Sequence, residues 1–356
     1  MKNYKTILVL LCGMLLLQSC KQKVNKKVTG CTFNLKLLDG QSGKVVVYPY
    51  QLVKTMEESK RLTIEKEVDI TNNTFNLDTV QVLRNFNISL NDKRFSAEIF
   101  TGPGTYNLSF GDDKLVVEGS NLHKEFQKLD EVLGYSKMKT IQYKKDLSKD
   151  EAEFKSNYGV NLLAAIKENS KSQSLAAIVY KFYWAADLPT LNTILTSFDT
   201  SIHNNFYLKQ LIKRKDNLEK VAVGQEAPIF TLNSFENKKV SLKSYRGSFL
   251  LIDFWAYWCG PCIAGFPELK EIRAEYDEDE LSILSVSTDI NKDKWVEAVK
   301  KHQLPWTQLI DDETNVSDTY AITAIPHLIL ISPEGEIVYK HHYSNNLTEE
   351  LKKFLK

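Results

Sequence analysis

The chain has 356 residues, which is too long for one ordinary hydrophobic core and predicts two or three domains. Hydrophobic residues make up 43% of the sequence, a share typical of globular proteins, so disorder along the whole chain is excluded. The formal net charge of +1 gives no overall field to attract nucleic acid. The sequence also has neither a basic stripe with interleaved aromatic residues nor a glycine-rich phosphate loop, so no nucleic-acid partner is expected.

The first residues have the pattern of a bacterial export signal. Lys2 and Lys5 precede an apolar run over 7–17, whose 11 residues are too few to span a bilayer, because a spanning helix needs about 20. The run ends in the tetrapeptide Leu-Gln-Ser-Cys, which resembles a bacterial lipobox, the motif whose cysteine is lipidated and becomes the new first residue. We therefore predict a signal peptide over 1–19 and a lipid on Cys20; an ordinary signal peptide that happens to contain a cysteine is the alternative.

The polar, basic stretch that follows predicts a linker over 20–30 that ties the folded protein to the membrane. No later segment of the sequence is long and apolar enough to cross a bilayer. The predicted location is therefore the bacterial cell envelope, on the periplasmic side, with the lipid as the membrane anchor.

Residues 31–120 have the pattern of a β-rich domain. Apolar and polar residues alternate over 33–37 and again over 74–77, as expected of strands with one buried face. Glycine, proline and asparagine turns separate such segments. We predict an antiparallel sandwich or curled sheet, with Cys31 as a buried, unreactive thiol at its start.

Residues 121–220 change to a helical period. Leu122 and Phe126 recur at helical spacing, and a capping box from Ser148 to Glu151 starts another helix. The pattern predicts four or five helices that connect the two ends of the protein, with aromatic residues packed in a core rather than lining a cofactor pocket.

Residues 222–356 have the pattern of an α/β domain. Strands are predicted near 229–232, 240–242, 249–255, 281–287, 328–331 and 336–340, and helices from the cysteine pair onward, over 294–301 and over 347–355. The runs over 249–255 and 281–287 lack alternation, which indicates strands buried on both faces. The order predicts an α/β sandwich with a mixed central sheet, so the whole chain is expected to be multidomain.

Two cysteines stand two residues apart in the motif Cys259-Gly260-Pro261-Cys262. This spacing can close a small disulfide ring or supply two metal ligands. Zinc normally takes four ligands, and the sequence offers no second cysteine pair and no suitable histidine spacing. We therefore predict a redox-active disulfide, with no metal and no other cofactor.

The position of the motif predicts different roles for the two cysteines. The strand over 249–255 ends shortly before Cys259, so this residue is expected at the first turn of a helix. A helix N-terminus carries about half a positive charge and unpaired N–H groups, and both stabilise a thiolate. We expect Cys259 to attack a substrate disulfide and the more buried Cys262, one turn further in, to resolve the mixed disulfide.

The decapeptide over 253–262 resembles the active-site strand and turn of thioredoxin, and Ile325-Pro326 resembles the cis-proline segment of that family. The segment 224–228 and the turn at Arg246 resemble exported thioredoxin-like reductases related to those of cytochrome c maturation. The resemblance covers residues 222–356. The front of the chain is similar to a β-rich domain of unknown function that often precedes such reductases.

The resemblance implies a thioredoxin-like fold in which Pro326 lies across from the disulfide and binds the substrate backbone. The residues implied in substrate binding are Trp258, Gly260, Pro261, Ile325, Pro326 and His327. Asp253 stands in an apolar strand at a position that matches thioredoxin, where burial raises the pKa and makes it a candidate proton acceptor for Cys262. A structural aspartate that bonds backbone donors is the alternative.

Other residues at the site leave alternatives open. Gly265 stands where some exported reductases carry a glutamate, so a mechanism that needs this glutamate is in doubt. His327 stands where thioredoxins usually carry threonine. Its imidazole is expected either beside the disulfide or at a strand edge facing solvent. Trp258 is either an exposed contact residue or core, whereas Trp255 is expected in the core.

These residues predict a thiol-disulfide oxidoreductase that reduces disulfides of exported proteins through Cys259 and Cys262. Its expected partners are exported protein thiols and disulfides and a membrane electron donor. A thiol peroxidase is one alternative, although the sequence over 255–258 lacks the threonine that such enzymes place before the nucleophile. A non-catalytic scaffold is another, and the intact cysteine pair argues against it.

Overall fold

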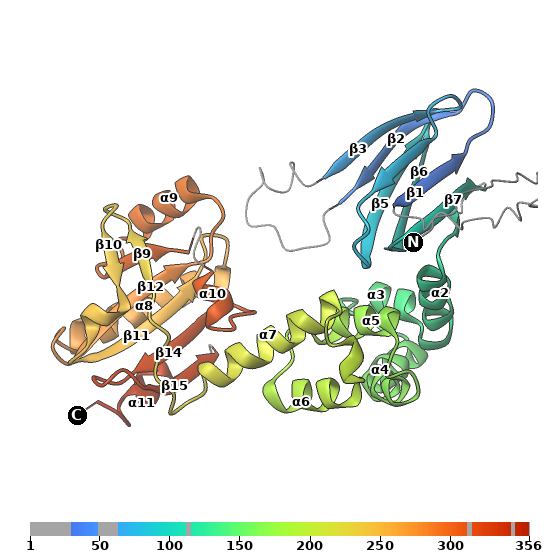
Figure 1. The fold of residues 1–356 in the computed structure, drawn as a ribbon. Coiled ribbons are helices and arrows are strands. Elements are labelled where there is room, and N and C mark those ends of the chain that lie inside the picture. Colours follow the sequence, from blue (N-terminus) through green and yellow to red (C-terminus); the bar gives the residue numbers. More distant parts are fainter. Residues whose placement is uncertain (1–29, 49–62, 112–114, 312–314, 343–345, 356) are drawn as a thin grey trace, which may run out of the picture.

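The computed structural model describes residues 30–48, 63–111, 115–311, 315–342 and 346–355. The predicted signal peptide over 1–19 and the predicted lipidation site Cys20 lie outside the described residues. Within these residues, no helix combines the length and the apolar character needed to cross a membrane. A β-rich part, a helical part and an α/β part follow one another in the predicted order (Figure 1).

The β-rich part consists of two four-stranded sheets that pack on a shared core. The first sheet has the order β4-β1-β7-β8, formed by Thr74–Leu77, Cys31–Lys36, Gly104–Phe110 and Leu115–Glu118. The second has the order β3-β2-β5-β6, formed by Ile64–Asp69, Ser42–Val47, Val82–Leu90 and Lys93–Thr101. Phe33 and Phe86 connect the sheets, because their buried rings lie 5.0 Å apart.

The predicted antiparallel arrangement is wrong at one strand pair, since β1 and β7 run parallel. Alternation identifies the buried face of a strand but not its neighbour. The chain comes back to β7 from the second sheet, and this crossover allows the parallel pairing. Cys31 is a buried free cysteine, as predicted, and burial raises the pKa of its thiol.

In the described part of the chain, six α-helices follow the sheets, where four or five were predicted. They are α2 (Asn121–Leu133), α3 (Tyr135–Ile141), α4 (Lys149–Glu168), α5 (Gln173–Tyr183), α6 (Leu188–Ser197) and α7 (Phe206–Lys220). The capping box is confirmed, because the side chains of Ser148 and Glu151 each bond the other's backbone N–H. Gly134 ends α2 at a left-handed φ of 68°, which glycine adopts without steric cost, and α3 begins directly after it.

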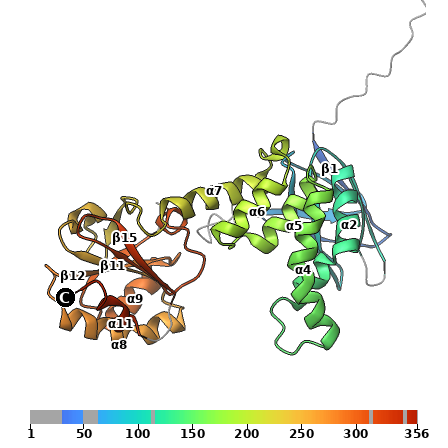
Figure 2. The same ribbon diagram turned by 90° about the horizontal axis from the view of Figure 1, so that it is seen from below.

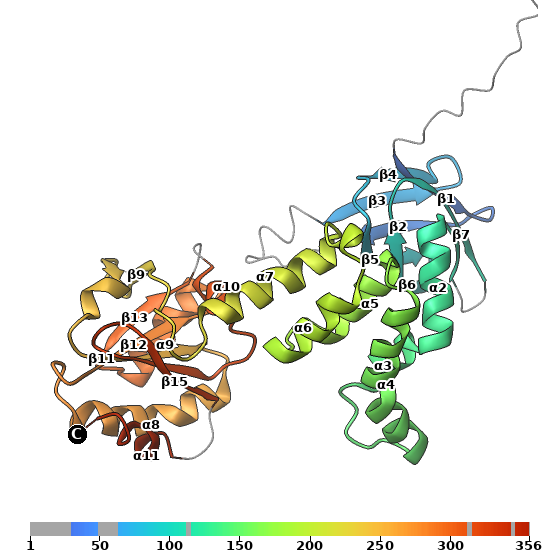
Figure 3. The same cartoon turned by 60° about the horizontal axis from the view of Figure 1, so that its bottom comes forward.

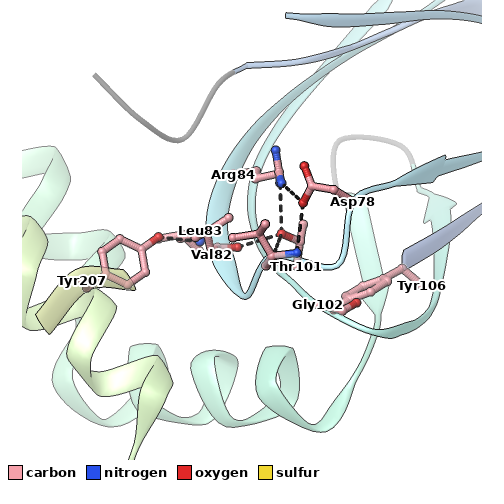
Figure 4. A network of polar contacts seen from close by, with 9 residues as sticks. Asp78, Val82, Leu83, Arg84, Thr101, Gly102, Tyr106 and Tyr207 are labelled. Atoms are coloured by element: carbon pink, nitrogen blue, oxygen red, sulfur yellow. Dashed lines mark hydrogen bonds and ion pairs between the residues drawn. The ribbon is translucent and has the colours of Figure 1, made fainter. Parts of the chain in front are cut away.

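A buried polar network joins the second sheet to the helices (Figure 4). Arg84 is only 4% exposed; it donates to the Thr101 hydroxyl and pairs with the Asp78 carboxylate. Beside them, the Tyr207 hydroxyl of α7 accepts a hydrogen bond of 2.6 Å from the backbone N–H of Leu83. Apolar side chains of β5 and β6 also belong to the core of the helices. The β-rich and helical parts therefore share a core at this junction.

The α/β part is built on a mixed sheet with the order β10-β9-β13-β12-β11-β14-β15. The strands are β9 (Thr231–Ser234), β10 (Lys239–Ser241), β11 (Phe249–Trp255), β12 (Leu281–Ser287), β13 (Thr307–Ile310), β14 (His327–Ile331) and β15 (Ile337–His342). The helices are α8 (Gly260–Glu275), α9 (Lys292–His302), α10 (Val316–Thr319) and α11 (Leu347–Leu351). β11 runs parallel to β12 and antiparallel to β14, which confirms the predicted mixed sheet.

The helices divide between the two faces of this sheet, with α8, α9 and α11 grouped together in Figure 2. α8, α9 and α11 share a core with Leu251 and Trp255 of β11. α10 shares the opposite core with Ile252 and Phe254, because successive side chains of a strand point to opposite faces. The cysteine pair belongs to the core on the α8 face.

Helix α7 connects the helical part to the α/β part (Figure 3). Arg214 donates to the backbone carbonyls of Ala186 and Ala321, and Asn217 donates to the carbonyl of Asp318. Asp318 and Ala321 lie in and just after α10, on the segment that leads to the predicted cis-proline. Through Tyr207 and these two residues, α7 is hydrogen-bonded to the β-rich part at Leu83 and to the α/β part at Asp318 and Ala321.

Candidate active site

The two cysteines form a disulfide at the start of α8, and their Cα atoms lie 5.3 Å apart. Cys259 is the N-cap residue of the helix, and its sulfur accepts a hydrogen bond of 3.2 Å from the N–H of Cys262. Gly260 and Pro261 occupy the first turn. Proline is tolerated there because the first N–H groups of a helix have no intrahelical partner. The helix therefore begins at the cysteine pair, as predicted.

Both cysteines are nearly inaccessible in the disulfide form, with Cys259 4% exposed and Cys262 3% exposed. The predicted difference in burial between them is thus not observed in this state. The helix N-terminus still distinguishes the two sulfurs. That of Cys259 lies at the positive end of α8 and accepts an N–H, and both features favour its thiolate.

Two tryptophans precede the disulfide, one at the end of β11 and one in the loop that follows it. Trp258 is 63% exposed, whereas Trp255 is fully buried and packs edge-on against Phe266 at 5.2 Å. Of the two alternatives for Trp258 the exposed one is observed, and Trp255 lies in the core as predicted. Ile290, in the loop after β12, is also 59% exposed.

The Ile325–Pro326 peptide bond is cis. β14 starts at the next residue, His327, which pairs with Phe254 near the end of β11. Pro326 therefore lies beside the strand end that leads into the disulfide loop, which is the arrangement that the resemblance to thioredoxin implies.

A carboxyl group is buried on the α8 face of β11. Asp253 is 3% exposed and accepts a hydrogen bond of 2.8 Å from the Ser285 hydroxyl. Burial raises the pKa of Asp253 to about 7, and the hydrogen bond from Ser285 offsets part of that rise. Among the described residues no backbone N–H bonds this carboxyl group, so the structural alternative lacks the partners that it requires.

The α/β part of the chain is similar in sequence to known proteins. The AhpC/TSA family profile matches residues 223–340. A solved thioredoxin domain of a thiol-disulfide oxidoreductase from Bacteroides vulgatus is 32% identical, with a TM-score of 0.36, and the match covers 38% of this chain and 99% of that domain. A thiol-disulfide oxidoreductase from Bacteroides fragilis is 34% identical, with a TM-score of 0.34, and the match covers 37% of this chain and 100% of that one.

The thiol-disulfide oxidoreductase ResA of Halalkalibacterium halodurans is 27% identical over 171 residues, which cover 48% of this chain and 91% of the relative. ResA of Bacillus cereus is 32% identical over 122 residues, which cover 34% of this chain and 70% of the relative. The chain belongs to the thiol-disulfide oxidoreductases. The cysteine pair of this oxidoreductase is Cys259 and Cys262.

In this oxidoreductase the residue after the cis-proline does not face solvent. His327 is 6% exposed, and β14 lies between β11 and β15 rather than at an edge. The imidazole and the Phe254 ring are nearly perpendicular, with their centroids 6.5 Å apart, on the face of the sheet that α10 covers. The solvent-facing alternative is therefore wrong. The sequence predicted the two strands joined by a turn over 333–335, but not that β14 lies inside the sheet, between β11 and β15.

A second buried carboxyl group of the oxidoreductase was not predicted. Asp289 is 2% exposed and accepts hydrogen bonds from the Tyr257 backbone N–H at 2.9 Å and from the Ser287 hydroxyl at 2.8 Å. Burial raises the pKa of Asp289. These contacts tie the loop after β12 to the loop that precedes Cys259. The polar run over 287–289, directly after an apolar strand, was the available signal.

The remaining features that could form a site lie away from the disulfide. Among the described residues no group of three or more histidine, cysteine, aspartate or glutamate side chains is placed to hold a metal ion. Hollows of about 280 and 440 Å³ open between the β-rich and helical parts, and none of their lining residues comes from the α/β part of the oxidoreductase.

Proposed function

We propose that this oxidoreductase is an exported, lipid-anchored protein that reduces disulfides of other exported proteins on the periplasmic side of the bacterial cell envelope. The observation that carries the proposal is the Cys259–Cys262 disulfide at the N-terminus of α8. An exposed Trp258 flanks it, and a buried Asp253 lies on the sheet face that α8 covers. In this proposal the reduced site combines a stabilised Cys259 thiolate, a contact surface at Trp258 and a proton acceptor at Asp253.

The first step is attack by the Cys259 thiolate on one sulfur of a client disulfide. A mixed disulfide forms between Cys259 and the client, and the second client sulfur leaves as a thiolate. In this proposal Trp258, Gly260 and Pro261 contact the client on one side of the disulfide, and the segment from Ile325 through Pro326 to His327 contacts its backbone on the other.

The second step releases the client. The Cys262 thiol gives its proton to the Asp253 carboxylate and attacks the Cys259 sulfur, so the internal disulfide forms and the remaining client thiolate leaves. Two electrons have passed to the client. Its two thiolates take up protons, one from Asp253 and one from water. To restore the Cys259 thiolate and the Cys262 thiol, a membrane electron donor must supply two electrons to the disulfide, and one proton is taken up by Cys262.

The reducing direction is tested by the reduction potential of the cysteine pair. We expect a value between about −270 and −200 mV, the range of thioredoxins and glutaredoxins, because a client is reduced only by a couple at lower potential. Equilibration of the full chain with glutathione redox buffers measures this value. A potential near about −120 mV, the range of strong periplasmic oxidants, would contradict the reducing direction.

The contact role of Trp258 is tested by the Trp258→Ala variant. We expect KM for a protein client to rise about tenfold with kcat unchanged, because an exposed tryptophan contributes binding rather than chemistry. Because the Trp258 side chain also hydrogen-bonds the buried Asp289 carboxyl group, its removal should lower the free energy of unfolding by about 1 kcal/mol. The matched control is Trp184→Ala, which removes a 46% exposed tryptophan from the end of α5. Equal kinetic effects of both variants would exclude a specific contact.

The lipid anchor is tested by the Cys20→Ser variant. The motif that ends at Cys20 supports the anchor, because lipidation requires the cysteine thiol. We expect the wild-type protein in the membrane fraction of the producing cells and the variant in the soluble periplasmic fraction. A variant that stays with the membranes would rule out this anchor.

A further inference from the structure

A chain of two hydrogen bonds ends at the buried carboxyl group of the active site. The indole N–H of Trp306 donates to the Ser285 hydroxyl oxygen at 2.8 Å, and the Ser285 hydroxyl donates to the Asp253 carboxyl oxygen at 2.8 Å. All three residues are buried, with exposed fractions of 7%, 0% and 3% respectively. Asp253 and Ser285 are register partners on β11 and β12, and Trp306 directly precedes β13.

The donor and acceptor properties of the three side chains determine the direction of the two hydrogen bonds. An indole N–H only donates, so Ser285 must accept from Trp306. With its oxygen held in this way, the hydroxyl hydrogen is directed at Asp253. A hydrogen bond from a neutral donor stabilises the charged form of a carboxyl group, and it does so most strongly in a buried site. The two hydrogen bonds therefore oppose the rise in the pKa of Asp253 that burial causes.

Among the groups around Asp253, these two hydrogen bonds provide the main polar contact of its carboxyl group. β14 contributes Leu328, α8 contributes Phe266 and Cys262, and α9 places His302 against the Phe266 ring. On this face the cysteines are joined in a disulfide. No charged side chain of the described residues is among the causes that shift the pKa of Asp253, which are burial and the Ser285 hydrogen bond.

We infer that Trp306 and Ser285 are positioning residues that keep Asp253 able to accept a proton at neutral pH. This inference rests on the proposed role of Asp253 as the acceptor for Cys262. Without the Trp306 N–H, the Ser285 hydroxyl can rotate and spend less time bonded to the carboxylate. More of Asp253 is then protonated at pH 7, and fewer molecules can take the proton of Cys262.

The test compares four variants of the full chain: Trp306→Phe, Ser285→Ala, Ser285→Thr and Trp295→Phe. The readout is the rate of mixed-disulfide resolution as a function of pH, together with the ionisation of Asp253 in the reduced protein followed by infrared spectroscopy. Ser285→Ala and Trp306→Phe should move the acid limb of the rate profile and the Asp253 ionisation to higher pH, by about one unit for Ser285→Ala and less for Trp306→Phe.

Two of the variants are controls. Trp295 is fully buried in the same core as Trp306, and its indole N–H bonds no group of the described residues. Trp295→Phe thus removes a similar volume without changing the hydrogen bonds to Asp253, and should leave the pH profile of mixed-disulfide resolution unchanged. Ser285→Thr keeps the hydroxyl and should show the wild-type pH profile. If Trp306→Phe does not fold, the contrast between the two Ser285 variants still decides the role of the hydroxyl.

The outcomes separate the inference from the proposal on which it rests. An acid limb that disappears in Asp253→Asn but keeps its position in Ser285→Ala and Trp306→Phe would overturn the inference alone. An acid limb that survives in Asp253→Asn would remove the proposed role of Asp253. A shift of equal size in Trp295→Phe would assign the effect to packing and would also overturn the inference.

Discussion

Replacing Cys262 with serine is expected to stop the reaction at a stable mixed disulfide between Cys259 and the client protein. The serine hydroxyl cannot attack the Cys259 sulfur as a thiolate does, so the bond to the client persists. Turnover should fall by about a thousandfold or more, because both cysteines are needed in every cycle. Electrophoresis without reductant measures the conjugates, and mass spectrometry of the released proteins identifies the clients.

Two controls decide what the trapped conjugates mean. Cys31→Ser removes a free thiol that is buried in the β-rich part, and should leave turnover unchanged and trap nothing. Cys259→Ser should form no conjugates, because the attacking sulfur is gone. Conjugates that accumulate equally in Cys259→Ser and Cys262→Ser would show that a different thiol attacks the client, and would contradict the assigned roles.

The Asp253→Asn variant is expected to resolve the mixed disulfide about a hundredfold more slowly at neutral pH. Asparagine keeps the shape of the side chain but cannot take the proton of Cys262. Because burial holds the pKa of Asp253 at about 7, the wild-type rate should rise through this pH as the carboxylate forms. That rise should be absent in the variant. Rapid-mixing measurements of mixed-disulfide decay from about pH 5 to about pH 9 follow both effects.

The same carboxyl group links stability to pH. Its pKa of about 7 in the folded protein lies above the ordinary value of 3.8, so the folded state holds the proton more tightly than the unfolded chain. Its contribution to stability is fully present below about pH 4 and is lost as the pH rises to about 7. In urea unfolding of the oxidised protein, the free energy of unfolding of the wild type should fall by up to about 4 kcal/mol more than that of Asp253→Asn as the pH rises through this range. Parallel pH curves for the two proteins would contradict the raised pKa.

The sequence predicted the α/β part well where the strands are long and fully buried. β11 and β12 have the predicted bounds, because their runs contain no apolar–polar alternation. β13 is a short strand that was not predicted, although other strands of three or four residues were. In the β-rich part, alternation gave the buried faces, but the parallel pairing of β1 with β7 depends on sheet order, which a local pattern does not contain.

A local sequence pattern also cannot predict which distant segments meet at the site. Asp253, Trp258 and the cysteine pair stand in one contiguous stretch, so local sequence was enough to identify them. Ser285, Asp289 and Trp306 come from distant segments and reach the site only because β12 lies between β11 and β13. For His327 the sequence left two alternatives open, because the two strands joined by the turn at 333–335 were predicted but their place within the sheet was not.

Helix α7 is the connection between the part that carries the disulfide and the rest of the described protein. Its 15 residues span about 22 Å, since each helical residue advances the chain by about 1.5 Å. A coil of the same number of residues has no fixed length, whereas this helix is hydrogen-bonded to Leu83 at one end and to Asp318 and Ala321 at the other. We therefore expect the cysteine pair to be held at a set distance from the β-rich part, so that a client has to approach a site of fixed position rather than one carried on a flexible linker.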